Sequence, residues 1–117
     1  MYKHIKKILF KLQPEEAHHL VMRNLKNYTS FPGVGKLLDK NYQFNHPSLE
    51  REVFGIKFKN PIGLAAGFDK NAEFIEELNH FGFGFIEIGT VTPKPQPGND
   101  TPRMFRLVED EAVINRM

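Results

Sequence analysis

The sequence contains no cysteine, and none of its apolar segments is both long and uncharged. Without cysteine the chain can form neither disulfide bonds nor thiolate metal sites, which fits a reducing compartment. No apolar run approaches the roughly 18–20 residues that a transmembrane helix needs. Lysines interrupt the first apolar segment and no small-residue cleavage site follows it, so we expect no signal peptide. The sequence therefore predicts a protein that does not cross a bilayer.

Nucleotide-binding glycine motifs are missing as well. Gly82 and Gly84 lack a third glycine at the required offset, and no strand precedes them, so a dinucleotide-binding fold is poorly supported. A phosphate-binding P-loop sequence is also absent from the chain.

Positive charge is concentrated at the start of the chain. The formal net charge is +2, but the first 12 residues contain four lysines and no acid, so the remaining residues carry a net charge of −2. Nucleic acid is therefore not the expected partner of the main body. A basic segment among apolar residues instead suggests contact with a membrane surface.

Residues 60–71 are the most informative stretch, because their character changes halfway. Residues 62–66 carry no polar side-chain atoms, as expected of a parallel strand buried on both faces. A charged turn at 67–71 leads into residues 72–78, whose apolar members recur at helical spacing. This order of strand, turn and helix predicts a β/α unit.

Lys70 lies in the turn at the carboxyl end of that strand, where α/β proteins place their chemistry. A cation in the first turn of a helix opposes the helix dipole. Lys70 is therefore either an exposed lysine or a group aimed at an anion or an electron-rich ring. The small residues Ala65, Ala66 and Gly67 would let a flat ligand approach the backbone, although they equally suit tight packing of strand against helix.

A second strand is predicted at residues 83–91, with Thr90 at its end. Thr90 would stand level with Lys70, so both could face one ligand, although ordinary β-propensity also explains a threonine here. Residues 92–99 form a stiff, proline-rich loop that is either a surface connection or a support for the next segment. Arg103 and Arg106 follow among apolar residues. Such arginines can hold a carbonyl group of a ligand or pair with an acid, for example Glu109 or Asp110.

Two amphipathic helices are predicted in the first 30 residues. The first covers residues 2–12, and Pro14 suits the first position of the second, with Glu15 and Glu16 in its first turn. The apolar face of the second helix comprises Ala17, Leu20, Val21, Leu25 and Tyr28. The pair could be a packed hairpin or could dip its apolar edge into lipid, and the basic first helix favours lipid.

Residues 34–51 carry less signal, with one short helix around 34–38 and a linker at 42–47. Residues 53–58 alternate in hydrophobicity around Gly55, which predicts a small β-hairpin.

Four segments, at residues 60–70, 82–99, 102–107 and 114–117, resemble the quinone-dependent (class 2) dihydroorotate dehydrogenases. The resemblance is collinear and covers essentially the whole chain, more loosely before Asn60. It implies an α/β fold that is the N-terminal part of a (β/α)8 TIM barrel preceded by a short amphipathic helical hairpin. Because such a barrel usually needs about 250 residues, we expect a truncated barrel whose reading frame continues with Gly-Phe-Asn.

The resemblance also implies a division of the chain into three segments. Residues 1–33 would be the helical extension that contacts membrane and quinone, residues 34–51 a linker, and residues 52–117 the first part of the flavin-binding barrel.

The resemblance further implies the site residues. FMN would contact Ala66, Gly67, Lys70 and Thr90. Dihydroorotate or orotate would contact Lys70 and Asn115, and quinone would contact His18 and Arg106. The catalytic base, a serine in this family, is expected in a later barrel loop, and no metal site is expected.

The implied activity is oxidation of (S)-dihydroorotate to orotate with FMN and a membrane quinone, a step of pyrimidine biosynthesis. The implied location is peripheral, on the cytoplasmic face of the bacterial inner membrane, and the segment alone is expected to be inactive. Ala72 stands where the family often has glycine, and an alanine at a helix start is harmless. Gln13 is a weaker helix cap than the aspartate that is usual in the family. Two alternatives remain: a soluble class 1-like flavin oxidoreductase on the same barrel, and a non-catalytic membrane-binding module.

Overall fold

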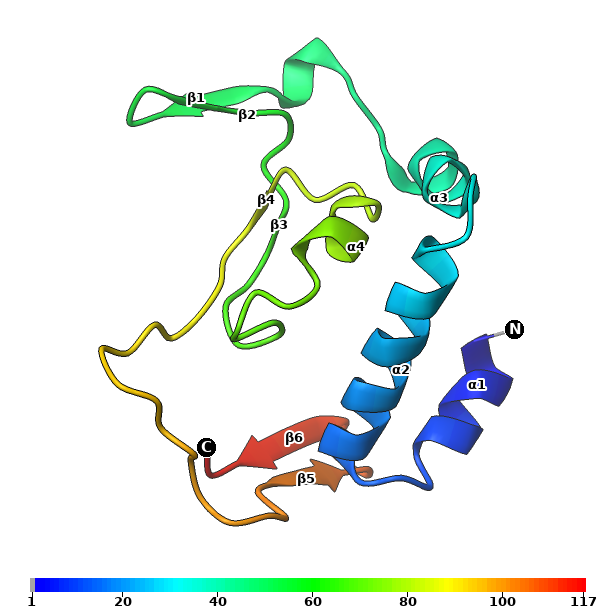
Figure 1. Ribbon diagram of the computed structural model, residues 1–117, viewed down its shortest axis with the longest axis vertical. Helices are drawn as coiled ribbons and strands as arrows, with labels where there is room; N and C mark the ends of the chain where they lie inside the picture. Colours follow the sequence, from blue (N-terminus) through cyan, green and yellow to red (C-terminus); the bar gives the residue numbers. More distant parts are fainter. Residues whose placement is uncertain (1) are drawn as a thin grey trace. The chain divides into compact units, whose positions relative to one another are not determined.

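The computed structural model of the chain describes residues 2–117, and of Tyr2 only the backbone. The described residues form helices and short strands, and the strands pair in three separate two-stranded sheets (Figure 1). By their contacts the residues divide into two units. One unit contains the chain up to Asn24 together with Lys94–Met117, and the other contains Leu25–Pro93.

The first unit begins with helix α1 (Tyr2–Leu9) and the start of helix α2 (Pro14–Thr29). Helix α2 begins at Pro14, which confirms the prediction. The Gln13 N–H donates a hydrogen bond to Glu16 Oε2 at 3.1 Å. This bond is one half of a capping box, so the carboxylate three residues along compensates for the weak cap that Gln13 provides.

The first unit ends with strands β5 (Met104–Leu107) and β6 (Ala112–Asn115), which pair antiparallel. The register places Met104 opposite Asn115 and Leu107 opposite Ala112. Apolar burial in this unit is centred on α2, where Met22 is 2% exposed.

The apolar face predicted for α2 is only partly buried. Ala17 is buried and Leu25 is half-buried, whereas Leu20, Val21 and Tyr28 are exposed. Membership of the predicted face therefore does not determine burial, since a helix side chain is buried only where another element covers it.

The second unit contains the remainder of α2, then helix α3 (Val34–Tyr42) and a single 3₁₀ turn at Pro47–Leu49. Strands β1 (Arg51–Val53) and β2 (Ile56–Phe58) form an antiparallel hairpin. The short helix and the hairpin around Gly55 are therefore confirmed. Gly55 has a φ of 75°, a conformation that glycine adopts without steric cost.

Strands β3 (Gly63–Leu64) and β4 (Phe85–Ile86) are parallel neighbours on either side of helix α4 (Ile75–Asn79). This confirms the predicted β/α unit. Inside the unit, the apolar face predicted for the helix is only partly buried, since Leu78 is 4% exposed and Phe74 is half-buried, whereas Ile75 is 43% exposed.

Two details of the predicted β/α unit are wrong. The strand was expected to be buried on both faces over residues 62–66, but β3 is half-buried and Ala65 and Ala66 are exposed. Among the described residues β4 is the only strand that pairs with β3, and a parallel strand is buried on both faces only inside a larger sheet with helices on either side. The helix was expected from Ala72, but Ala72 has a φ of 59° and Phe74 a φ of −132°, both outside the helical range, so the helix begins at Ile75.

In the part of the chain that is described, no helix combines the length and the hydrophobicity needed to span a bilayer.

Candidate functional site

The carboxyl ends of β3 and β4 leave their sheet at the same edge. Leu64 lies opposite Ile86, and the Glu87 N–H donates to the Leu64 carbonyl at 2.9 Å. Beyond these residues the chain continues through Ala66 and Gly67 on one side and towards Thr90 on the other. Because the strands are parallel, the two segments that were predicted to hold a flavin both begin at the same edge of the sheet.

The backbone at Ala66 and Gly67 is open. Both residues are exposed, Gly67 has a φ of 94°, and no atom lies within 4 Å of the position that a Cβ would occupy there. Because glycine has no side chain, a flat ring can approach the Gly67 backbone closely. These residues fit the flavin contact that the resemblance implies.

Lys70 follows this turn in a loop that its neighbour Asp69 holds in place. The Asp69 carboxylate accepts hydrogen bonds from the Glu73 N–H at 2.9 Å and from the Phe74 N–H at 2.8 Å. Asp69 is 5% exposed, whereas Lys70 is exposed. The buried Asp69 carboxylate thus holds the loop by two amide hydrogen bonds, and the Lys70 side chain in this loop is exposed to solvent.

The helix-dipole argument about Lys70 is wrong, because Lys70 lies ahead of α4 rather than in its first turn. A cation at this distance from a five-residue helix experiences little of its dipole. Lys70 therefore lies in an open loop, where it is available to an anion.

Thr90 is exposed and lies four residues beyond β4. The peptide bond that precedes it is cis. The convergence of Thr90 and Lys70 on one ligand stays a prediction, supported by the parallel pairing of the strands that lead to them.

Arg106 is held by the connection between α1 and α2. Its Nη1 donates to the Leu12 carbonyl at 2.7 Å, and its guanidinium carbon lies 4.5 Å from the centroid of the Phe10 ring. The side chain is half-buried in β5. A guanidinium stacked on an aromatic face and bonded to a carbonyl is restricted in position, although the residues that restrict it are far away in sequence.

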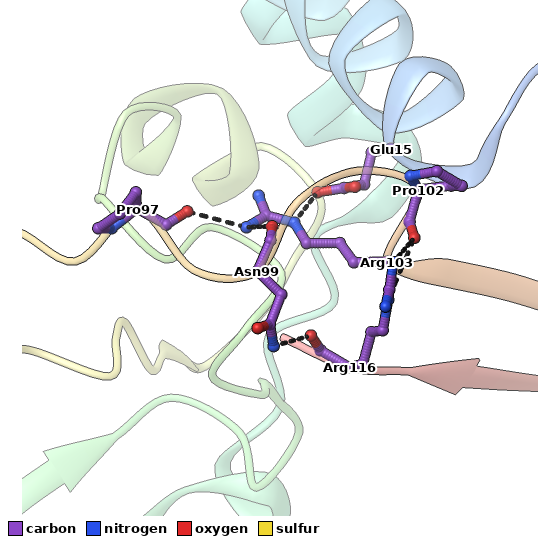
Figure 2. A network of polar contacts seen from close by, with 6 residues as sticks. All are labelled: Glu15, Pro97, Asn99, Pro102, Arg103 and Arg116. Atoms are coloured by element: carbon purple, nitrogen blue, oxygen red, sulfur yellow. Dashed lines mark hydrogen bonds and ion pairs between the residues drawn. The ribbon is translucent and has the colours of Figure 1, made fainter.

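Arg103, three residues earlier, is tied to the first turn of α2. Figure 2 shows its guanidinium between the Glu15 carboxylate and two carbonyls of the proline-rich loop. Nε donates to Glu15 Oε1 at 2.9 Å, and Nη1 donates to the carbonyls of Pro97 at 3.0 Å and Asn99 at 3.4 Å. The acidic partner is therefore Glu15, and the alternatives Glu109 and Asp110 are wrong for this arginine.

The same network closes the proline-rich loop onto Arg116, the residue after β6 (Figure 2). Asn99 Nδ2 donates to the Arg116 carbonyl at 2.6 Å, and the Arg116 guanidinium donates to the Pro102 carbonyl at 3.1 and 3.3 Å. These bonds support the prediction that the loop holds its neighbouring segment rather than simply crossing the surface.

His18 and Arg106 lie in the same unit. His18 is half-buried on α2, one turn after Glu15, and its ring centroid is 5.6 Å from that of His19. Glu15 and His18 are therefore neighbours on one side of the helix.

Asn115 is the last residue of β6 and is exposed. It was expected near the end of another strand of the active face, but β6 pairs antiparallel with β5 and not with β4. Asn115 belongs to the first unit, while Ala66, Gly67, Lys70 and Thr90 belong to the second.

Sequence reasoning missed three residues that fix these side chains: Phe10, Glu15 as the partner of Arg103, and Asp69. An aspartate shortly before a helical pattern is a capping signal, so Asp69 could have been found from the sequence. The contacts of Phe10 and Glu15 leave no local signal. Within residues 2–117 no cluster of three or more potential metal ligands occurs.

Comparison with known proteins identifies the class of this chain. A family model described as dihydroorotate dehydrogenase matches residues 48–117. Among solved structures, DHODH from Eimeria tenella in complex with ferulenol has a TM-score of 0.67 and 43% sequence identity, and the match covers 92% of this chain and 28% of that one. The chain therefore belongs to the dihydroorotate dehydrogenase family, and the family and this neighbour place it with the TIM-barrel enzymes of the α/β class.

Similar curated proteins carry a more specific name. The chain is 58% identical over its whole length to the dihydroorotate dehydrogenase (quinone) of Christiangramia forsetii, of which it covers 35%. It is 56% identical over 93% of its length to the protein of the same name from Aliivibrio fischeri strain MJ11, of which it covers 31%. The chain thus spans about a third of the length of the curated relatives it matches.

Proposed function

We propose that this chain is the N-terminal part of an oxidoreductase that oxidises (S)-dihydroorotate to orotate with FMN and a membrane quinone as acceptor. The observation that carries this proposal is the similarity along the whole chain to proteins named dihydroorotate dehydrogenase (quinone). The parallel β3–β4 pair supports it, since it gives the chain the start of a β/α barrel with its open turns at one edge.

In this proposal the flavin, when bound, supplies the redox chemistry and the protein supplies position and electrostatics. The open backbone of Ala66 and Gly67 would border the flavin ring, and the Thr90 hydroxyl would donate a hydrogen bond to it. The Lys70 ammonium would neutralise the substrate carboxylate, and the Asn115 amide would hydrogen-bond the pyrimidine ring. The base that removes the substrate proton would be a serine outside this segment, so we expect the segment alone to be inactive.

The acceptor would be bound by the first unit. His18 and the Arg106 guanidinium would hydrogen-bond the quinone. In the net reaction, the quinone would take up the two electrons and two protons that dihydroorotate loses. The fixed and half-buried position of Arg106 supports this role, because an immobilised donor loses little entropy when a ligand binds.

The segment 1–33 would be a helical hairpin that lies on the membrane, followed by a linker at 34–51 and the flavin-binding barrel from residue 52. Ile5 and Ile8 of α1 are 44% and 67% exposed, next to exposed lysines. An apolar face with basic flanks suits an interfacial helix on anionic lipid. We accordingly propose a peripheral location on the cytoplasmic face of the bacterial inner membrane.

The complete reading frame provides the test. We expect the purified protein to be yellow, to show flavin absorbance that dihydroorotate bleaches without oxygen, and to recover its colour when quinone is added. Lys70→Gln should raise the KM for dihydroorotate at least tenfold, because the variant loses the charge that meets the carboxylate. The matched control Lys57→Gln alters an exposed lysine of the β1–β2 hairpin and should leave this KM unchanged.

A colourless protein that binds liposomes would favour the non-catalytic membrane module. A yellow protein that uses a soluble acceptor and ignores quinone would favour the class 1-like enzyme. Either result would overturn the proposal.

A further inference from the structure

Arg106 of strand β5 and Arg103, the residue before β5, are attached to the connection between α1 and α2 and to the first turn of α2. Arg106 contacts Phe10 and the Leu12 carbonyl, and Arg103 is paired with Glu15. More than 85 residues separate the partners in each hydrogen-bonded pair. Tertiary contacts of this kind hold a strand and a helical connection in one relative position, and all of these residues belong to the first unit.

We propose that Phe10 and Glu15 are positioning residues for the acceptor half-reaction, which hold the Arg106 guanidinium and His18 in the arrangement that receives the acceptor. This inference rests on the proposed function, because it assumes that Arg106 and His18 face the quinone. It adds two residues that need not touch the acceptor at all.

Phe10 acts on Arg106 directly. The guanidinium lies over the ring at 4.5 Å from the centroid, within the range of a cation–π contact. The Leu12 carbonyl takes one of the five N–H donors of this guanidinium, and others are left for an oxygen atom of a ligand. The ring and the carbonyl thus restrict the position of the guanidinium from two sides, so its donors are held in place before a ligand arrives.

Glu15 acts through the helix. The Glu15 side chain is 19% exposed and the Arg103 side chain is 23% exposed, so solvent screens this ion pair less than an open surface pair. Because Glu15 and His18 are one turn apart on α2, the ion pair also sets where the imidazole stands relative to β5.

A competing explanation is that these contacts only stabilise the fold. In that case their loss would lower stability and both half-reactions together. A positioning role predicts that only the acceptor half-reaction is weakened. Without Phe10 or Glu15 the acceptor itself would have to order the donors of Arg106, which lowers its affinity. The two explanations therefore differ in which kinetic constants change.

The test uses the complete flavin-loaded protein with decylubiquinone as the acceptor. Phe10→Leu keeps apolar volume and removes the ring, and it should raise both the KM and the Kd for decylubiquinone about two- to fivefold. Phe10→Tyr keeps the ring and should restore both constants to within about twofold of wild type. The rate of flavin reduction by dihydroorotate, measured by stopped flow without oxygen, should be unchanged in both variants.

Glu15→Gln removes the charge of the ion pair and should raise the KM and Kd for decylubiquinone about two- to fivefold. Glu16→Gln is the matched control, because Glu16 lies in the same turn and bonds only the Gln13 amide among the described contacts. It should leave the quinone constants unchanged. The Kd is measured by calorimetry, so binding is read independently of turnover.

Unchanged quinone constants in Phe10→Leu and Glu15→Gln would overturn the inference, as would equal losses in flavin reduction and quinone reduction. Failure of the proposed function gives a different result, because the wild-type protein itself would then not pass electrons from dihydroorotate to decylubiquinone.

Discussion

Replacement of Asp69 by alanine is the most direct test of how the Lys70 loop is held. The substitution removes two hydrogen bonds, to the amides of Glu73 and Phe74, from a carboxylate that is 5% exposed. Each bond contributes about 1 kcal/mol net, so Asp69→Ala should destabilise this loop by about 2 kcal/mol. Asp69→Asn keeps one acceptor oxygen and should cost about 1 kcal/mol.

Amide hydrogen exchange read on peptides covering residues 69–79 measures this loss. A local cost of about 2 kcal/mol corresponds to exchange roughly 30-fold faster at the Glu73 and Phe74 amides. Peptides from the β1–β2 hairpin provide an internal reference that should not change. The control variant Glu76→Ala removes an exposed carboxylate of α4 and should cost less than about 0.5 kcal/mol.

Unchanged protection of these amides in Asp69→Ala would refute the reasoning, because the carboxylate would then not be the group that holds the loop. Uniform loss of protection over the whole chain would refute it too, since the effect would be global unfolding rather than release of the loop.

Three further predictions concern single elements. Ala72→Gly should raise the free energy of unfolding by about 0.5–1 kcal/mol, because a residue with a φ of 59° is strained unless it is glycine. A urea midpoint no higher than that of the wild type would contradict this. The control Ala65→Gly should not stabilise the protein. Met22→Ala should lower the free energy of unfolding, measured by urea titration, by about 2–5 kcal/mol, since Met22 is 2% exposed. The control Val21→Ala, at a site that is 44% exposed, should lower it by less than about 1 kcal/mol. Deletion of α1 from the complete protein should abolish sedimentation with anionic phospholipid vesicles, because each lysine contributes about 1 kcal/mol of attraction, and retained sedimentation would show that the membrane contact lies elsewhere.

At Ala72 the chain differs from the family, which often has glycine at this position, and the structure shows where this difference matters. From the sequence, alanine in place of glycine appeared harmless at the start of a helix. In the structure Ala72 lies in the loop ahead of α4 with a positive φ. The departure thus falls on a backbone conformation that favours glycine.

Local patterns determined much of this protein from its sequence. Pro14 with two acids after it marked the start of α2, the alternation around Gly55 marked the β1–β2 hairpin, and the small residues before Lys70 marked the end of a parallel strand. These signals are reliable because caps, turns and strand periodicity depend on residues within a few positions of one another. The resemblance to the dihydroorotate dehydrogenases was likewise in the sequence, and the family is confirmed.

The contacts that position side chains were decided only by the tertiary structure. Three features depend on which distant segment lies alongside. These are the position of Arg106 over the Phe10 ring, the pairing of Arg103 with Glu15, and the exposure of Leu20. Periodicity specifies which face of an element is apolar, but it does not specify what covers that face. Folding brings together residues that no local pattern relates, and for that reason the arrangement around Arg106 required the three-dimensional structure.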